Sequence, residues 1–149
     1  MRFRLRSKVI AAVAAILAGV ALALFATSGP AVAFFSGGLF LDVQVQSPAT
    51  LVARGAAVDV PLKITCNATD SAFVSVTVTQ HSGSGVAQGS GGTQVACTGS
   101  SQRIVVRVTA SAFGKPFKQG TAVATADLSG CRPGVCGGET DTETITLQR

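Results

Sequence analysis

The feature that most constrains this chain is an alternation of apolar and polar residues with a period of two. The clearest run spans residues 58–66, where every second position is apolar: Val58, Val60, Leu62, Ile64 and Cys66. Successive side chains of a β-strand point to opposite faces of the sheet. The run therefore predicts a half-buried strand that carries a cysteine on its buried face.

The same alternation recurs along the rest of the chain, and no stretch after the N-terminal region shows the spacing of an amphipathic helix. Further strands are predicted over residues 41–46, 73–80, 93–97, 102–109, 121–128 and 140–148. The Gly- and Ser-rich residues 81–92 are expected to form a loop or two weak edge segments, and residues 110–120 a connection. About seven short strands predict an all-β fold, an immunoglobulin-like antiparallel sandwich over residues 41–149.

The first 33 residues have the composition of an export signal. Basic residues at positions 2, 4, 6 and 8 precede an apolar run over residues 9–26, and Ala31-Val32-Ala33 follows. This order predicts a Sec signal peptide over residues 1–33, with a helical apolar segment and cleavage after Ala33. The alternative is a membrane anchor formed by residues 9–26, since about 18 apolar residues can span a bilayer. Residues 34–40 are then a flexible lead-in to the folded domain.

The charge distribution excludes a nucleic-acid-binding protein. Four of the twelve Lys and Arg residues lie in the first eight positions, so the chain after Ala33 carries eight basic residues against seven acidic ones. Nucleic-acid binders carry a basic stripe or patch, and the remaining basic residues here are scattered. We expect neither nucleic acid nor, after signal cleavage, a membrane as a partner.

Four cysteines follow the signal segment: Cys66, Cys97, Cys131 and Cys136. An even number in a short exported chain predicts disulfides, and three pairings are possible. Pro133-Gly134 can turn the chain back so that Cys131 and Cys136 close locally, which leaves Cys66 with Cys97. The alternative, Cys66–Cys131 with Cys97–Cys136, would place the turn against cysteines on other strands. A zinc site is disfavoured, because CxxC pairs are absent and His81 is the only histidine.

No arrangement of residues predicts catalysis or a cofactor. His81 has no identifiable partner and there is no G-x-S-x-G motif, so we interpret it as a surface residue. The carboxylates Glu139, Asp141 and Glu143 could suggest glycoside hydrolysis, but they alternate with threonine, which is typical of a solvated strand edge. The glycines of residues 83–92 are not followed by a helix, as a phosphate-binding loop requires. We therefore predict a protein that is not an enzyme.

Three stretches carry a resemblance to a known group of proteins. They are CNATDSAFVSVTVTQ from Cys66, GSGGTQVAC ending at Cys97, and FKQGTAVATA from Phe117. They resemble small secreted actinobacterial proteins of unknown function with an immunoglobulin-like β-sandwich. The resemblance covers about half of the chain after Ala33. It implies the same fold, export and a Cys66–Cys97 bridge, and it implies no activity.

A weaker resemblance is to the apoproteins of the enediyne antitumour antibiotics. These are secreted immunoglobulin-like domains with two disulfides, one of which closes a C-x4-C loop as Cys131 and Cys136 would. The other cysteine pair is more widely separated here than in those proteins. The resemblance implies a carrier of a small, chromophore-type molecule.

The sequence is compatible with three functions. The first is a non-enzymatic binding or surface-interaction module whose partner is a protein or a cell surface. Its interaction residues are expected in the loops 83–92 and 110–120, the latter with Phe113, Lys115, Phe117 and Lys118. The two phenylalanines form either an exposed apolar pair or, preferably, core plugs at one end of the domain.

The second function is the small-molecule carrier, which needs an apolar cleft and is disfavoured by the scarcity of aromatic residues. The third, a secreted enzyme, is disfavoured by the motifs.

Overall fold

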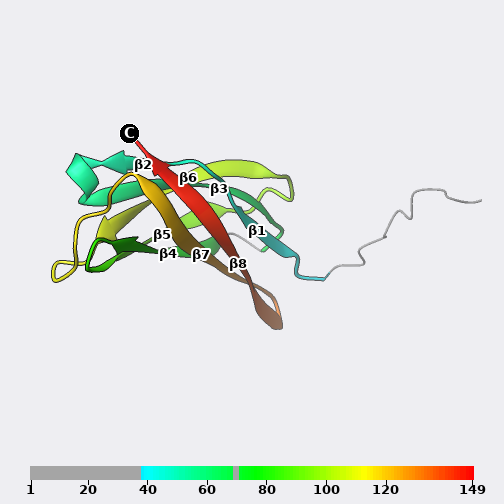
Figure 1. Ribbon diagram of the computed structural model, residues 1–149. Helices are drawn as coiled ribbons and strands as arrows, with labels where there is room; N and C mark the ends of the chain where they lie inside the picture. The colour runs from blue at the N-terminus through cyan, green and yellow to red at the C-terminus, as the bar shows by residue number, and fades with distance from the viewer. Residues whose placement is uncertain (1–37, 69–70) are drawn as a thin grey trace, which may run out of the picture. The chain divides into compact units, whose positions relative to one another are not determined.

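The computed structural model describes residues 38–68 and 71–149. The predicted signal segment, its cleavage after Ala33 and residues 34–37 of the lead-in lie outside this range. Within it the fold is all-β, as predicted, with eight strands and one turn of 3-10 helix (Figure 1). The elements are β1 Leu41–Val45, β2 Ala49–Val52, η1 Ala53–Gly55, β3 Ala57–Cys66, β4 Ser71–Ser82, β5 Gly85–Ala96, β6 Gln102–Ala110, β7 Gly120–Arg132 and β8 Val135–Gln148.

The strands form one hydrogen-bonded sheet in the order β1-β3-β2-β8-β7-β4-β5-β6, and a further pairing of β3 with β6 closes it. Two of the junctions are short. β2 pairs in parallel with β8 only at Ala49↔Leu147 and Thr50↔Gln148. β5 pairs with β6 only at Gly89↔Ala110 and Ser90↔Thr109. The alternation of apolar and polar residues shows only which face of each strand is buried. It therefore does not distinguish one closed sheet from two stacked sheets. The immunoglobulin-like sandwich thus stays a prediction.

β1 and β2 lie along the same edge of β3. Val45 of β1 pairs with Leu62, and Thr50 of β2 pairs with Asp59. Ser47-Pro48, joined by a cis peptide bond, lies between the two strands. The alternation over residues 41–46 stops at this point, so β2 was not predicted. Its four residues are too few to show a period.

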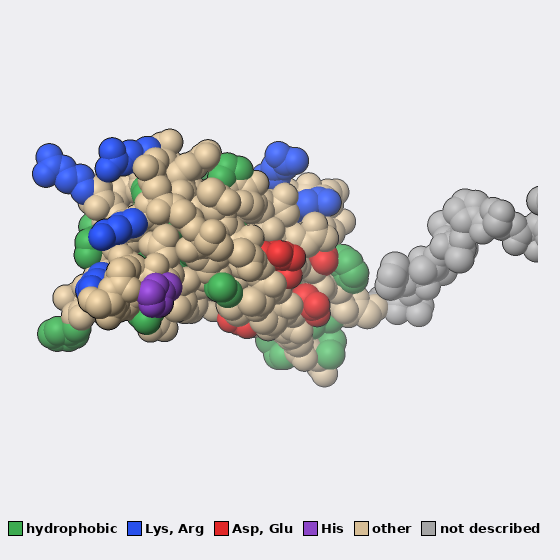
Figure 2. All heavy atoms as spheres, in the orientation of Figure 1, with side chains coloured by type: hydrophobic (Ala, Val, Ile, Leu, Met, Phe, Trp, Pro, Cys, Tyr) green, Lys and Arg blue, Asp and Glu red, His purple; other side chains and the backbone are tan. Residues whose placement is uncertain are grey.

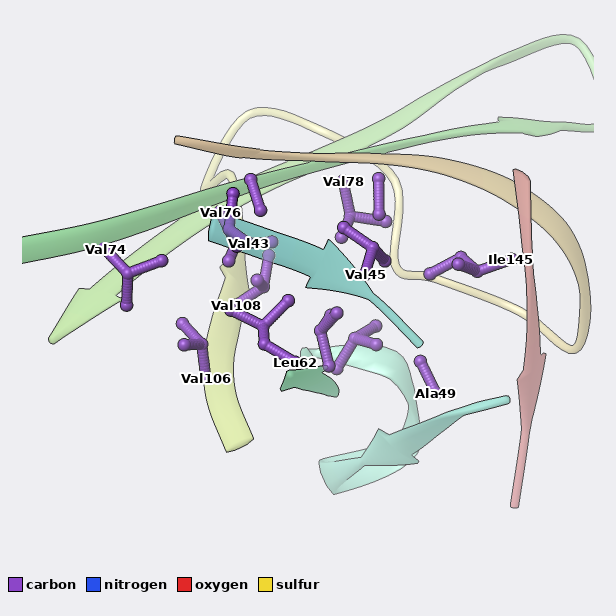
Figure 3. Packing of buried hydrophobic residues seen from close by; sticks show 14 of the residues in the cluster. Val43, Val45, Ala49, Leu62, Val74, Val76, Val78, Val106, Val108 and Ile145 are labelled. Carbon is purple, nitrogen blue, oxygen red and sulfur yellow. The ribbon is translucent and has the colours of Figure 1, made fainter. Parts of the chain in front are cut away.

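The interior is filled by the inward faces of the strands (Figure 3). All five apolar residues of the 58–66 run are fully buried, and each valine or leucine so placed stabilises the fold by about 1.5–3 kcal/mol. Valine, alanine, leucine and isoleucine make up most of this core. Phe117, which is 2% exposed, is the largest side chain in it.

Of the two alternatives for residues 81–92, the loop is wrong, since only residues 83–84 form a turn between two strands. β4 continues to Ser82, and β5 pairs with it along its whole length, from Ser82↔Gly85 to Ser71↔Ala96. A Cβ at Gly89 or Gly91 would collide with backbone carbonyl oxygens of β6, those of Thr109 and Arg107. These glycines therefore allow close approach of two backbones within a strand, and their presence does not indicate a loop.

Both predicted disulfides are formed. Cys66, which is fully buried, is bonded to Cys97, and Cys131 is bonded to Cys136. The latter two residues face each other across the β7–β8 hairpin, whose turn is Pro133-Gly134. Gly134 has a positive φ of 82°, which glycine adopts without strain.

Candidate functional site

The strand registers define two ends of the described fold, and we name them by what they carry. The disulfide end contains Cys66–Cys97 and Cys131–Cys136. The loop end contains η1, the β4–β5 turn at residues 83–84 and the loop of residues 111–119. Backbone hydrogen bonds hold its parts together, from Phe117 N–H to Gly55 O at 2.9 Å and from Ala110 N–H to Ala56 O at 2.8 Å. Figure 1 shows η1 and the yellow 111–119 loop at the same end.

The structure separates the two phenylalanines of this loop. Phe117 lies in the core, as expected for a core plug, whereas Phe113 is fully exposed. The prediction that both act alike is therefore wrong. The physical reason is the backbone bond of Phe117 to Gly55, which places residue 117 over the open end of the sheet. Phe113 belongs to the outward part of the loop.

A buried glutamine clamps the base of the loop. Gln80 of β4 is 4% exposed, its Nε2 donates to Lys118 O at 2.8 Å, and its Oε1 accepts from Lys118 N–H at 2.8 Å. Buried polar groups are normally paired in this way, and leaving them unpaired destabilises the fold. Sequence reasoning missed this residue. The available signal was its place on the inward-facing positions of β4, in register with Val76 and Val78.

Three more hydrogen bonds order the outer part of the loop. Ser111 N–H donates to Gln88 O at 2.7 Å, and Gly114 N–H donates to Ser111 O at 3.0 Å. Lys115 Nζ donates to Ser84 Oγ of the β4–β5 turn at 3.2 Å. Phe113 is thus presented to solvent by a loop that is fixed on both sides of it.

A hollow of about 890 Å³ opens at the loop end beside η1. Its lining consists of Leu51, Arg54, Gly55, Pro116, Phe117, Lys118, Gln119 and Arg149. Three of these side chains are cationic and none is acidic. Figure 2 shows Lys and Arg side chains at this end and also over the other half of the molecule, where the visible Asp and Glu side chains lie.

The backbone beneath this hollow is unusual. Ala53 and Arg54 have positive φ angles of 48° and 58°, a region that residues other than glycine seldom adopt. Gly55 follows with φ 91°, and a Cβ there would collide with the carbonyl oxygen of Phe117. Only glycine therefore allows η1 to lie against the loop.

The residues considered for catalysis do not converge. His81 is exposed on β4 and pairs across the hairpin with Val86. Asp141 Oδ2 accepts a hydrogen bond from Val45 N–H at 2.7 Å and thereby holds β1 against β8, while Glu139 and Glu143 are exposed. Within residues 38–68 and 71–149, no group of three or more His, Cys, Asp or Glu residues is arranged to hold a metal ion.

An ion pair lies on the outer face of the sheet. Arg107 donates from Nε and Nη2 to the two carboxylate oxygens of Asp59, at 2.7 and 2.8 Å. The hydrogen bond from Arg107 holds the pKa of Asp59 below its ordinary value, and the same bond raises the pKa of Arg107. The pair links β3 to β6 and lies outside the loop-end hollow.

The disulfide end has a hollow of its own, of about 570 Å³. It lies beside Phe73, which is half exposed, and the Cys131–Cys136 bridge.

The described part of the chain contains no helix long and apolar enough to span a membrane.

Comparisons with known proteins give only distant likenesses. No protein-family model and no curated protein matches the chain. Among solved structures it is similar to AggA, the major subunit of aggregative adherence fimbriae type I from Escherichia coli, with 14% identity, a TM-score of 0.39, and coverage of 75% of this chain and 95% of that one. It is also similar to the sporulation control protein Spo0M from Bacillus subtilis, with 11% identity, a TM-score of 0.34, and coverage of 76% and 51%. Likenesses at this level carry no inference about function.

Proposed function

We propose that this protein is a secreted, disulfide-stabilised, non-enzymatic binding module that engages a protein or cell-surface partner through its loop end. The observation that carries the proposal is the full exposure of Phe113 on an otherwise fixed loop. Large apolar side chains are normally buried, so an exposed one that is held in place is a candidate anchor.

The energetics of binding favour such an anchor. Aromatic residues dominate the binding energy of many protein interfaces, because they bury a large area at low entropic cost. Ordering a mobile loop would reduce the affinity. The bonds of Ser111, Lys115 and Lys118 fix this loop before any partner arrives.

The carrier function receives less support. The loop-end hollow, of about 890 Å³, is larger than the hollow of about 570 Å³ at the disulfide end, and three cationic side chains line it. An apolar chromophore needs an apolar cleft instead.

We interpret the closed sheet as an immunoglobulin-like sandwich of two layers. One layer consists of β1, β3, β2 and β6, and the other of β8, β7, β4 and β5. Only the two short junctions, β2 with β8 and β5 with β6, join these layers.

Export is part of the proposal. Two disulfides are typical of proteins outside the reducing cytosol, and residues 1–33 have the pattern of a signal peptide. The intact mass of the extracellular protein should correspond to a chain that begins at Phe34. Protein that retains residues 1–33 in the membrane fraction would establish the anchor alternative.

Photo-crosslinking tests the binding end directly. A photoreactive phenylalanine analogue placed at position 113 keeps an aromatic ring there, and the same analogue at position 73 is the matched control at the disulfide end. On producing cells, the position 113 protein should give an adduct that unlabelled protein competes away. Adducts from position 73 alone, or from neither position, would refute the assignment.

A further inference from the structure

The loop-end hollow has the chemistry of a site for a negatively charged ligand. Arg54, Lys118 and Arg149 come from three separate segments of the chain and line the same hollow. Among the described residues the ion pair present is Arg107 with Asp59, and none of the three cations shares in it. The charges of these side chains are therefore available to an incoming anion, which a hollow lined by cationic side chains attracts.

The backbone under Arg54 strengthens this interpretation. A non-glycine residue in a sparsely populated conformation costs about 1–3 kcal/mol, and such residues cluster at ligand sites. Ala53 and Arg54 are two in succession, and Gly55, which packs closely against Phe117, follows them. The strained turn places Arg54 in the wall of the hollow.

The remaining lining residues narrow the class of ligand. Leu51 and Pro116 add apolar surface, and Gln119 adds an amide that can both donate and accept hydrogen bonds. Sugar rings present apolar C–H faces and hydroxyl groups, which this mixture suits. A guanidinium fork matches a carboxylate in geometry. An inorganic polyphosphate carries negative charge but has no apolar C–H faces that could pack against Leu51 and Pro116.

We propose that the hollow binds a carboxylate-bearing polysaccharide, with Arg54 and Lys118 holding carboxylates and Leu51 and Pro116 supporting the sugar rings. The inference rests on the proposed function, because it names the class of ligand taken at the same binding end. Phe113 lies on the outer part of the loop and is not among the lining residues.

Fluorescence anisotropy with labelled hexagalacturonate tests this proposal. Wild-type protein should bind it saturably, and log K should fall as log salt concentration rises. The double variant Arg54→Asn with Lys118→Gln should weaken binding at least tenfold. Asparagine tolerates the positive φ at position 54, and the bonds of Lys118 to Gln80 involve only its backbone. Arg54→Lys with Lys118 intact keeps the charge but loses the guanidinium fork, so it should weaken binding about two- to fivefold, and this single variant tests the site if the double variant folds poorly.

The matched control removes two cations from another face. Lys63 and Arg103 are opposite each other on β3 and β6. Lys63→Gln with Arg103→Gln changes the net charge equally and should alter affinity less than threefold. An equal loss in this control, no saturable binding, or equally tight binding of a polyphosphate of the same charge would overturn the proposal. A persisting adduct at position 113 would then show that only the ligand class is wrong.

Discussion

The two ends of this molecule are held together by different means. At the disulfide end, Cys66–Cys97 and Cys131–Cys136 fix the chain covalently. Within the described residues the loop end has no disulfide, and the amide of Gln80 and the ring of Phe117 hold it instead. The cysteines thus indicate which end is cross-linked, whereas the full exposure of Phe113 is the basis of our proposal that the loop end binds a partner.

The largest expected effect is at Phe117. Phe117→Ala leaves a cavity under the loop and should lower the free energy of unfolding by about 3–5 kcal/mol, measured by denaturant titration. Phe113→Ala is the matched control and should change it by less than about 0.5 kcal/mol, because that ring is exposed. A similar loss in both variants would mean that the two rings support the loop together.

The two disulfides should differ in their contributions. Replacing Cys66 and Cys97 by alanine opens a loop of 31 residues and should cost about 3–4 kcal/mol. Replacing Cys131 and Cys136 should cost about 2 kcal/mol, since the loop spans only five positions and the β7–β8 hairpin already pairs these residues. Denaturant titration of both variants measures the order, and the reverse order would contradict it.

Gln80→Leu tests the clamp at the loop end. The backbone N–H and C=O of Lys118 would lose their partners, at a cost of about 1–3 kcal/mol. Trypsin should also cleave after Lys118 faster than in the wild type. Gln88→Leu, at an exposed position of β5, is the control and should leave the cleavage rate unchanged. Unchanged cleavage in Gln80→Leu would show that other contacts order the loop.

The sequence predicted the structure correctly where the alternation of apolar residues or the spacing of cysteines extended over enough residues to be recognised. The inward face of residues 58–66 and the pairing of Cys131 with Cys136 followed from alternation and from a turn. The strand role of Gly89 and Gly91 did not, because the need for glycine there arises from β6, a neighbour distant in sequence. The alternation of β4 gave the inward position of Gln80, but it did not give the partner of this residue, Lys118, which is 38 residues away.

The smallest effect is expected at the Asp59–Arg107 pair, which belongs to neither end. The pKa of Asp59 is lowered in the folded state, so its contribution is present above the unfolded pKa of about 3.9 and is lost as pH falls through the folded value. Asp59→Asn should therefore lower Tm slightly at pH 7 and converge with wild type once the pH has fallen below the folded pKa of Asp59. Arg107→Gln should show the same convergence. A Tm difference that persists at low pH would assign the effect to packing.

The most direct test of the account compares partner affinity for two phenylalanine variants at opposite ends. Binding of the purified protein to cell-envelope material of the producing organism is measured for wild type, Phe113→Ser and Phe73→Ser. Phe113→Ser should weaken binding at least tenfold without changing Tm, because its ring is exposed, and Phe73→Ser should bind like wild type once folding is verified. Loss of binding in Phe73→Ser together with unchanged binding in Phe113→Ser would place the binding surface at the disulfide end and contradict the account.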